Sequence, residues 1–270
     1  MLHELATLAH AAVSLPELVP YPAETALKGL LRSGSLLARV RGGGDSYDSD
    51  DDDDGMSFII FVIMILLAGG LFWLFWWLRQ KKIREYRAWA AQYGYHYEPS
   101  DNSVVNFSTG DPFQEGRGRT GQDVFRGQYR GMHVIFFQYN YTTGSGKNSE
   151  THYNQVVAIG LPAPRPRLDI GHEGWFSRKF QKDIDFENQA FNDRYRIMSE
   201  NRRFAFDIIH ARTMEWMMAD QRALSNQWRF EGPWLMTWRA GELNLQEVFP
   251  YLDFLIDVYA QVPRFVWANH

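Results

Sequence analysis

The segment TTGSGKN, residues 142–148, contains the Gly, Ser and Lys residues that a phosphate-binding loop uses. That loop also needs a glycine where Tyr141 stands and a Ser or Thr where Asn148 stands. Ser145 lacks the outer glycine spacing of a serine-hydrolase elbow as well. The small polar residues of the segment instead predict a loop between two strands.

The spacing of the histidines does not match that of a metal site. His172 and Glu173 begin like a zinc-protease helix, but Phe176 occupies the position of the second histidine. The other histidines are scattered without ligand spacing, although His133 and His152 could approach each other across paired strands. Histidines on a strand face or on the surface are the favoured interpretation. The chain has no cysteine, which excludes disulfides and thiolate chemistry. We therefore predict no metal-binding and no cofactor-binding residue.

Three carboxylates alternate at Asp183, Asp185 and Glu187, so a strand would place them on one face. Such a face can supply a general acid and base or clamp a metal. An ordinary solvated face is the favoured interpretation, and no catalytic residue is predicted.

A run of arginines offers a surface that could bind anionic lipid headgroups. The alternative is that these arginines are salt-bridged or solvated. They are Arg117, Arg119, Arg126, Arg130, Arg165 and Arg167.

The longest apolar segment of the chain is residues 56–78, which contain no charged residue. As a helix it would be about 34 Å long, enough for a hydrocarbon core of about 30 Å. Trp73, Trp76 and Trp77 crowd one end, as interfacial aromatics do. The sequence therefore predicts one transmembrane helix.

Basic residues close to the ends of this helix predict its orientation. Only Arg39 and Arg41 lie within range on the N-terminal side. On the C-terminal side stand Arg79, Lys81, Lys82, Arg84 and Arg87. The rule predicts a single-pass protein of the cell membrane with a cytoplasmic C-terminal domain.

Residues 1–55 end in an acidic run and show no helix-length apolar pattern, which predicts disorder. An alternative is that Met56 is the natural first residue and that residues 1–55 are a misassigned upstream extension. Outside the acidic run, Asp45–Asp54, the chain is only mildly basic. No nucleic-acid partner is expected from this charge distribution.

The remaining residues predict an α+β fold, with a juxtamembrane helix at 79–98 and a globular domain at 99–270. Residues 123–131, 132–143 and 152–162 are rich in Val, Ile, Phe and Tyr and predict an antiparallel meander. The prolines of LPAPRPRLDI predict an extended connection or an edge strand. A hairpin is predicted around Glu231, Gly232 and Pro233.

Helices are predicted in two further places. Residues 201–220 have helical apolar spacing, and a last helix begins after Asn244, which with Glu247 resembles a capping arrangement. Its apolar stripe ends at Val262 and Pro263.

The order of several blocks resembles a family of uncharacterised actinobacterial single-pass membrane proteins. The blocks are WAAQYGYHYEPSD, GDPF, FRGQYRG, FQYNYTT, LPAPRPRLDI, DIDFENQAFNDRYRI, FAFDIIHARTMEWMM and FEGPWLMTWRAG. The match covers nearly all of residues 85–267, although Asp193 and Tyr195 depart from the usual residues. The resemblance implies a bacterial membrane protein with one anchor and one domain of unknown function.

These observations favour a non-enzymatic interaction domain, anchored in the bilayer at the inner face of a bacterial membrane. Its expected partners are the bilayer and either anionic lipid or another protein. The alternative is a membrane-tethered, hydrolase-like enzyme whose site is assembled from distant residues.

Overall fold

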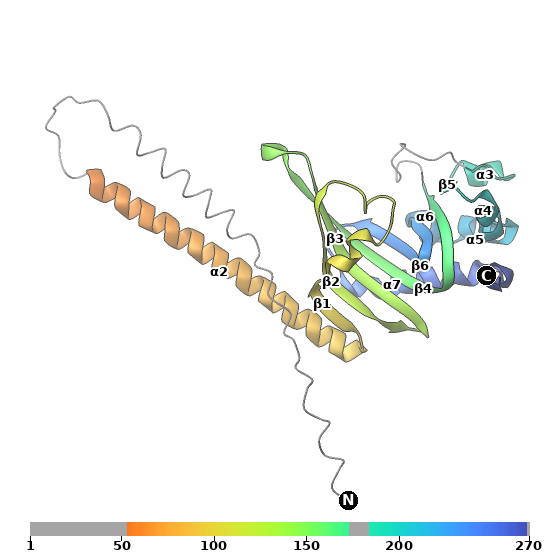
Figure 1. The fold of residues 1–270 in the computed structure, drawn as a ribbon, viewed down its shortest axis with the longest axis horizontal. Coiled ribbons are helices and arrows are strands. Elements are labelled where there is room, and N and C mark those ends of the chain that lie inside the picture. The colour runs from red at the N-terminus through yellow and green to blue at the C-terminus, as the bar shows by residue number, and fades with distance from the viewer. Residues whose placement is uncertain (1–52, 173–183, 269–270) are drawn as a thin grey trace, which may run out of the picture. The chain divides into compact units, whose positions relative to one another are not determined.

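The computed structural model describes residues 53–172 and 184–268, and the fold is α+β, as predicted (Figure 1). The chain divides into two units, residues 1–67 and 68–270. The helices are α2 (Asp53–Tyr93), α3 (Gln189–Asn192), α4 (Arg202–Ile208), α5 (Ala211–Ala219), α6 (Gln221–Ser225), α7 (Leu245–Gln261) and α8 (Arg264–Ala268). The strands are β1 (His96–Ser100), β2 (Arg117–Tyr129), β3 (Met132–Thr143), β4 (Glu150–Gly171), β5 (Arg196–Ser199) and β6 (Trp228–Ala240).

α2 is one continuous helix whose Ser57–Tyr93 part is long and apolar enough to cross a membrane. The large apolar side chains between Phe58 and Leu78 are all exposed. The helix ends where Gly94 adopts a left-handed φ of +75°, the C-terminal stop that the sequence predicts. Residues 96–98, which were expected in this helix, instead begin β1.

The sheet has six strands in the order β1-β2-β3-β4-β5, with β6 paired to β4, and every pairing is antiparallel. The predicted meander of β2, β3 and β4 is therefore confirmed. The TTGSGKN segment connects β3 to β4 and contains a short 3-10 helix, Gly146–Asn148, as expected for a loop.

The two proline segments had different outcomes. Residues 161–167 are extended within β4 and pair only around Arg165, as expected for an edge strand that cannot complete a ladder, whereas residues 168–170 are central because they pair with both β5 and β6. The hairpin predicted around Gly232 and Pro233 was wrong, because β6 runs through both residues. The register between β4 and β6 shifts from Gly160 to Arg165 and again from Arg165 to Leu168, opposite Gly232 with its φ of +56°. These bulges accommodate residues that cannot continue a regular ladder.

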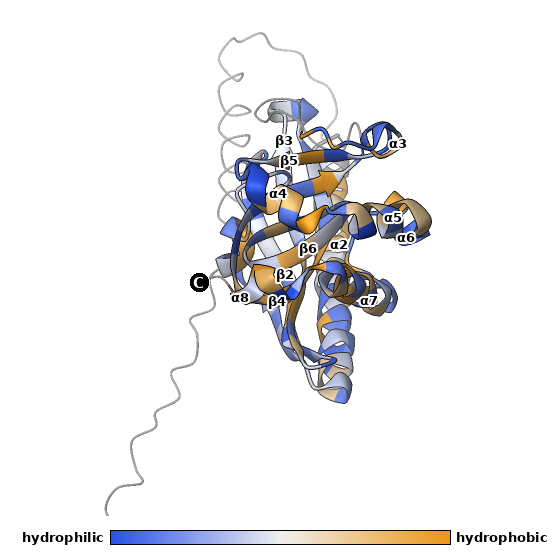
Figure 2. Cartoon of the chain, turned by 90° about the vertical axis from the view of Figure 1, so that its right-hand side faces the viewer, coloured by the Kyte–Doolittle hydropathy of each residue, from blue (hydrophilic) through white to orange (hydrophobic). Residues whose placement is uncertain are grey.

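The bulges also change which face of the sheet each side chain occupies. Trp228 and Phe230 belong to the same core as Leu235, although regular alternation would place positions 230 and 235 on opposite faces. That core is the larger one, and it receives apolar side chains from α2 to α8. Figure 2 shows α5, α6 and α7 together on this side of the sheet.

The other face carries a smaller core that includes Phe137, Tyr139 and Trp238. In the described part of the chain this core is covered by the loop of residues 101–116, which inserts Val104 and Phe113. The loop contains a 3-10 helix, Asn102–Asn106, capped by Asp101, and a cis Asp111–Pro112 peptide bond.

The remaining predicted helices are present, close to their expected bounds. The predicted helix at 201–220 is divided into α4 and α5, with Ile209 and His210 between them. α7 begins after Asn244, whose side chain accepts a hydrogen bond from the Gln246 amide, and it ends at Gln261. Asn244 also donates to Glu247 at 3.2 Å, so the predicted capping pair is confirmed.

Candidate functional site

The junction between α2 and the sheet is organised around Asp123, which is fully buried. Its carboxylate accepts a hydrogen bond from Arg79 at 3.0 Å and one from the Tyr97 hydroxyl at 2.7 Å, and Lys82 Nζ lies 3.4 Å away. Arg79 and Lys82 are three positions apart on α2, so they share one helix face. Asp123 has a φ of +50° at a bulge in β2, a conformation that turns its side chain toward α2.

Aromatic packing extends this junction along α2. The Trp89 ring stacks on Tyr95 at 5.5 Å and meets Phe125 and Phe136 edge-on at 5.5 and 6.0 Å. The Tyr86 hydroxyl donates to the Leu243 carbonyl at 3.0 Å. Burial, together with the hydrogen bond to Asp123, raises the pKa of Tyr97 well above its ordinary value. The end of α2 is therefore an integral part of the domain core.

A second group of buried charges lies on the opposite face of the sheet. Asp169 in β4 and Arg229 in β6 are both fully buried and form an ion pair. Arg167 also donates to Asp169 at 2.7 Å, and the Arg229 guanidinium lies over the Trp238 ring at 4.6 Å. Burial lowers the pKa of Arg229, while the Asp169 carboxylate opposes that shift.

This group binds the 101–116 loop to the sheet. Arg229 donates to the Ser108 hydroxyl at 2.6 Å, and Ser108 in turn donates to Glu231. Glu231 also accepts from the Thr109 amide at 3.1 Å. Burial opposes ionisation of Glu231, but the bonds from Ser108 and Thr109 and the charge of Arg229 together hold its pKa below the ordinary value. The loop is thus fastened by an ionised carboxylate.

Gly110 lets both arginines approach the loop. A Cβ atom at this position would lie 2.2 Å from Nη2 of Arg167 and 2.5 Å from Nη2 of Arg229. A side chain at position 110 would therefore displace the network. Both arginines and both carboxylates of the network bond to each other or to the loop, and Nη2 of Arg229 is buried without a hydrogen-bond partner in the described part of the chain. These contacts indicate a structural role.

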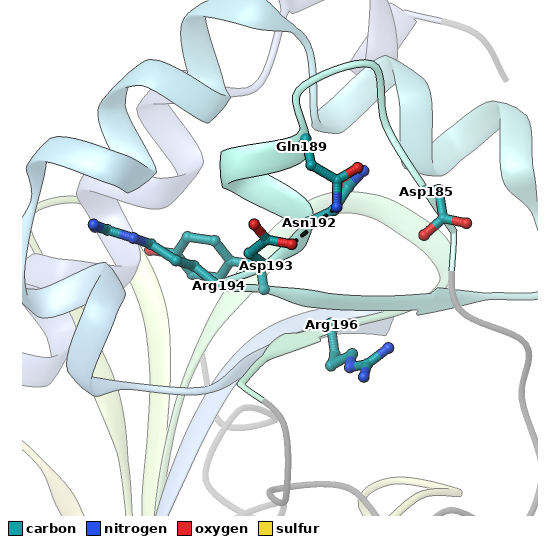
Figure 3. Close-up of a pocket in the computed structure, with 7 residues that line it drawn as sticks. Asp185, Gln189, Asn192, Asp193, Arg194 and Arg196 are labelled. Atoms are coloured by element: carbon teal, nitrogen blue, oxygen red, sulfur yellow. Dashed lines mark hydrogen bonds between the residues drawn. The ribbon is translucent and has the colours of Figure 1, made fainter.

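A polar pocket of about 310 Å³ lies around α3 and β5 (Figure 3). Two of its residues already have structural roles: the Asn192 amide donates to the Phe186 carbonyl at 2.7 Å, and the Tyr195 hydroxyl donates to the Met217 carbonyl at 2.7 Å. Gln189 donates to Asp193 at 2.9 Å. The described residues that line the pocket are Asp185, Gln189, Asn192, Asp193, Arg194, Tyr195 and Arg196, with no histidine, serine or lysine among them. They do not form a nucleophile paired with a base.

The histidines and carboxylates that the sequence offered as candidates do not come together in the fold. His152 faces Tyr141 across the β3–β4 ladder and contacts Thr143 at 2.7 Å, whereas His133 lies beside Gly160 at the other end. The two histidines are therefore not neighbours, and the favoured interpretation of separate strand histidines agrees with their places. Asp185 and Glu187 are exposed, as a solvated face requires, but their segment is not a strand. Asp183, Glu173 and Phe176 lie outside the described residues.

Most of the arginines considered for lipid binding have partners inside the domain, as the alternative interpretation expected. Arg119 donates to the Phe113 carbonyl at 3.0 Å, and Arg126 pairs with Glu98 at 2.8 Å. Arg130 pairs with Asp253 at 3.1 Å, and the Arg165 guanidinium lies over the Trp267 ring at 5.3 Å.

Sequence reasoning missed Asp123, Asp169, Arg229 and Glu231. A signal did exist in WRFEG, where the strand alternation places Arg229 and Glu231 away from the face of Trp228 and Phe230. The partners, however, lie far away in the chain, and Ser108 and Glu231 are separated by 123 positions.

These features define an α+β protein with a helix suited to crossing a membrane. The chain matches no protein-family model and no curated protein. It is similar to the crystal structure of the mycobacterial trehalose monomycolate transport factor A, with 16% identity over 67% of this chain and 95% of that chain. The TM-score is 0.49. A similarity of this size assigns neither a family nor a function.

Proposed function

We propose that the protein is a non-enzymatic interaction domain anchored by one helix at the inner face of a bacterial cell membrane. In this proposal residues 56–78 are the anchor, residues 99–270 form the domain and the last part of α2 joins them. The observation that carries the proposal is the continuity of α2. Its exposed apolar residues are followed at once by Arg79, which is bound to buried Asp123.

The charge distribution along α2 supports the inner-face orientation. Lys81, Arg84 and Arg87 are exposed, whereas Arg79 and Lys82 face Asp123. Cations at this end of a span favour the cytoplasmic side. The engagement of buried Asp123 and Asp169 and of half-buried Glu231 by structural partners supports roles in folding for these three carboxylates.

The test is a full-length chain expressed in a bacterium with a proximity-labelling enzyme fused after His270. We expect the fusion to stay in the membrane fraction at high pH and to label cytoplasmic proteins, with one partner protein enriched. A matched fusion with Leu66→Arg and Leu67→Arg should leave the membrane fraction. Release of the unaltered fusion by alkaline extraction, or labelling confined to extracytoplasmic proteins, would overturn the anchoring or the orientation respectively.

A further inference from the structure

The β3–β4 hairpin lies at the end of the sheet toward which α2 leaves the domain. Trp89 contacts Phe125, and ten residues nearer the N-terminus Arg79 contacts Asp123. The N-terminal direction along α2 is therefore also the N-terminal direction along β2, toward Arg117. Because β3 is antiparallel to β2, the same direction leads along β3 to Thr143 and the hairpin.

The hairpin extends well past the point where α2 departs. Gln138 pairs with Gln122, next to Asp123, and Thr143 lies five residues further along β3. At about 3.4 Å per residue this is about 17 Å of strand. Figure 1 shows the hairpin projecting beyond the rest of the sheet. α2 crosses the strands obliquely, so the displacement of the hairpin tip along the helix axis is smaller than the length of this strand segment.

The hairpin has side chains that suit a headgroup layer. Residues 144–150 are all exposed, and they include Lys147. Tyr153 is 41% exposed, and tyrosine favours the membrane interface because its ring is apolar and its hydroxyl is polar. Arg117, which pairs with Thr142, is exposed beside the hairpin. Lys147 and Glu150 make entry into hydrocarbon costly, so the polar tip should stop among the headgroups.

We propose that the hairpin tip, residues 144–149, rests on the phospholipid headgroups of the membrane that α2 enters. Lys147 and Arg117 would face the lipid phosphates, and Tyr153 would lie at the interface. This inference rests on the proposed anchoring by α2, and it does not depend on which side of the membrane the domain occupies.

The absence of cysteine permits a direct test with the full-length chain. Ser145→Cys gives a single thiol at the tip, where the serine makes no capping hydrogen bond. The matched control is Ser225→Cys. Ser225 is exposed in α6, close to the start of β6. The other end of β6, at Ala240, pairs with Asn154 near the hairpin, so Ser225 lies far from the tip. Both variants are labelled with a fluorophore and reconstituted into vesicles of phosphatidylethanolamine and phosphatidylglycerol that contain a headgroup-nitroxide lipid.

We expect several-fold stronger quenching of the label at position 145 than at position 225. Adding Lys147→Glu should lower the quenching at position 145, and replacing phosphatidylglycerol by phosphatidylcholine should do the same. Equal quenching at the two positions, in a chain that floats with the vesicles, would overturn the hairpin contact and leave the anchor intact. A chain that does not float would overturn the anchoring and this inference with it.

Discussion

Asp123→Asn tests whether the ionic contact at the junction holds α2 to the sheet. Asparagine keeps the shape of the side chain and its hydrogen bond with Tyr97, and it tolerates a positive φ. The change removes the negative charge that faces Arg79 and Lys82. Its effect therefore reports the charge and not the packing.

The magnitude follows from the burial of the partners. Removing one partner of a fully buried ion pair costs about 3–5 kcal/mol. The Asp123 side chain is 1% exposed, but those of Arg79 and Lys82 are 34% and 29% exposed and can turn to water. We therefore expect a loss of about 2 kcal/mol of unfolding free energy. For a domain of this size that corresponds to a Tm lower by about 4–8 °C.

The assay is thermal unfolding of the full-length chain in detergent, followed by near-ultraviolet circular dichroism of the buried aromatics. Glu98→Gln is the matched control, because it neutralises a carboxylate in a pair with Arg126 whose side chains are 41% and 35% exposed. That pair should contribute less than about 1 kcal/mol. Equal Tm values for Asp123→Asn and the unaltered chain would refute the proposed role of the buried contact.

Two further predictions concern the network that fastens the 101–116 loop. Because the pKa of Glu231 is lowered in the folded state, its stabilising contribution should be present above the ordinary value of 4.5 and be lost as pH falls through the lower folded value. The Tm of the unaltered chain should thus fall more between pH 6 and pH 3.5 than that of Glu231→Gln, as measured by calorimetry in matched buffers, and parallel falls would contradict this. Gly110→Ala should cost about 2–3 kcal/mol in urea unfolding, because its Cβ overlaps two guanidinium groups. Gly70→Ala has no atom within 4 Å and lies inside α2, so it should cost nothing and can only favour the helix. Similar midpoints for the two variants would count against the packing argument.

Local patterns were sufficient to predict much of the fold. The β-branched and aromatic runs of β2, β3 and β4 are separated by glycine-containing turns, so their antiparallel pairing is visible in the sequence. Gly94 and Asn244 mark the end of α2 and the start of α7 through their own backbone and side-chain preferences. Each of these signals acts within a few residues.

The errors arose where tertiary pairing overrides local preference. Gly232 and Pro233 favour a turn, but β4 offers a ladder with bulges at matching positions, and both halves of β6 pair with it. The burial of Asp123 likewise depends on cations more than 40 positions away. A single sequence contains no local sign of such long-range contacts.

The continuity of α2 limits how the proposed membrane protein could meet its partners. A flexible tether lets a domain explore a volume that grows with the tether's length. A helix that runs without a break into the aromatic core leaves no such tether between the proposed anchor and the domain. Encounters would then occur mostly in two dimensions, in the layer next to the bilayer. This favours partners that are themselves bound to the membrane.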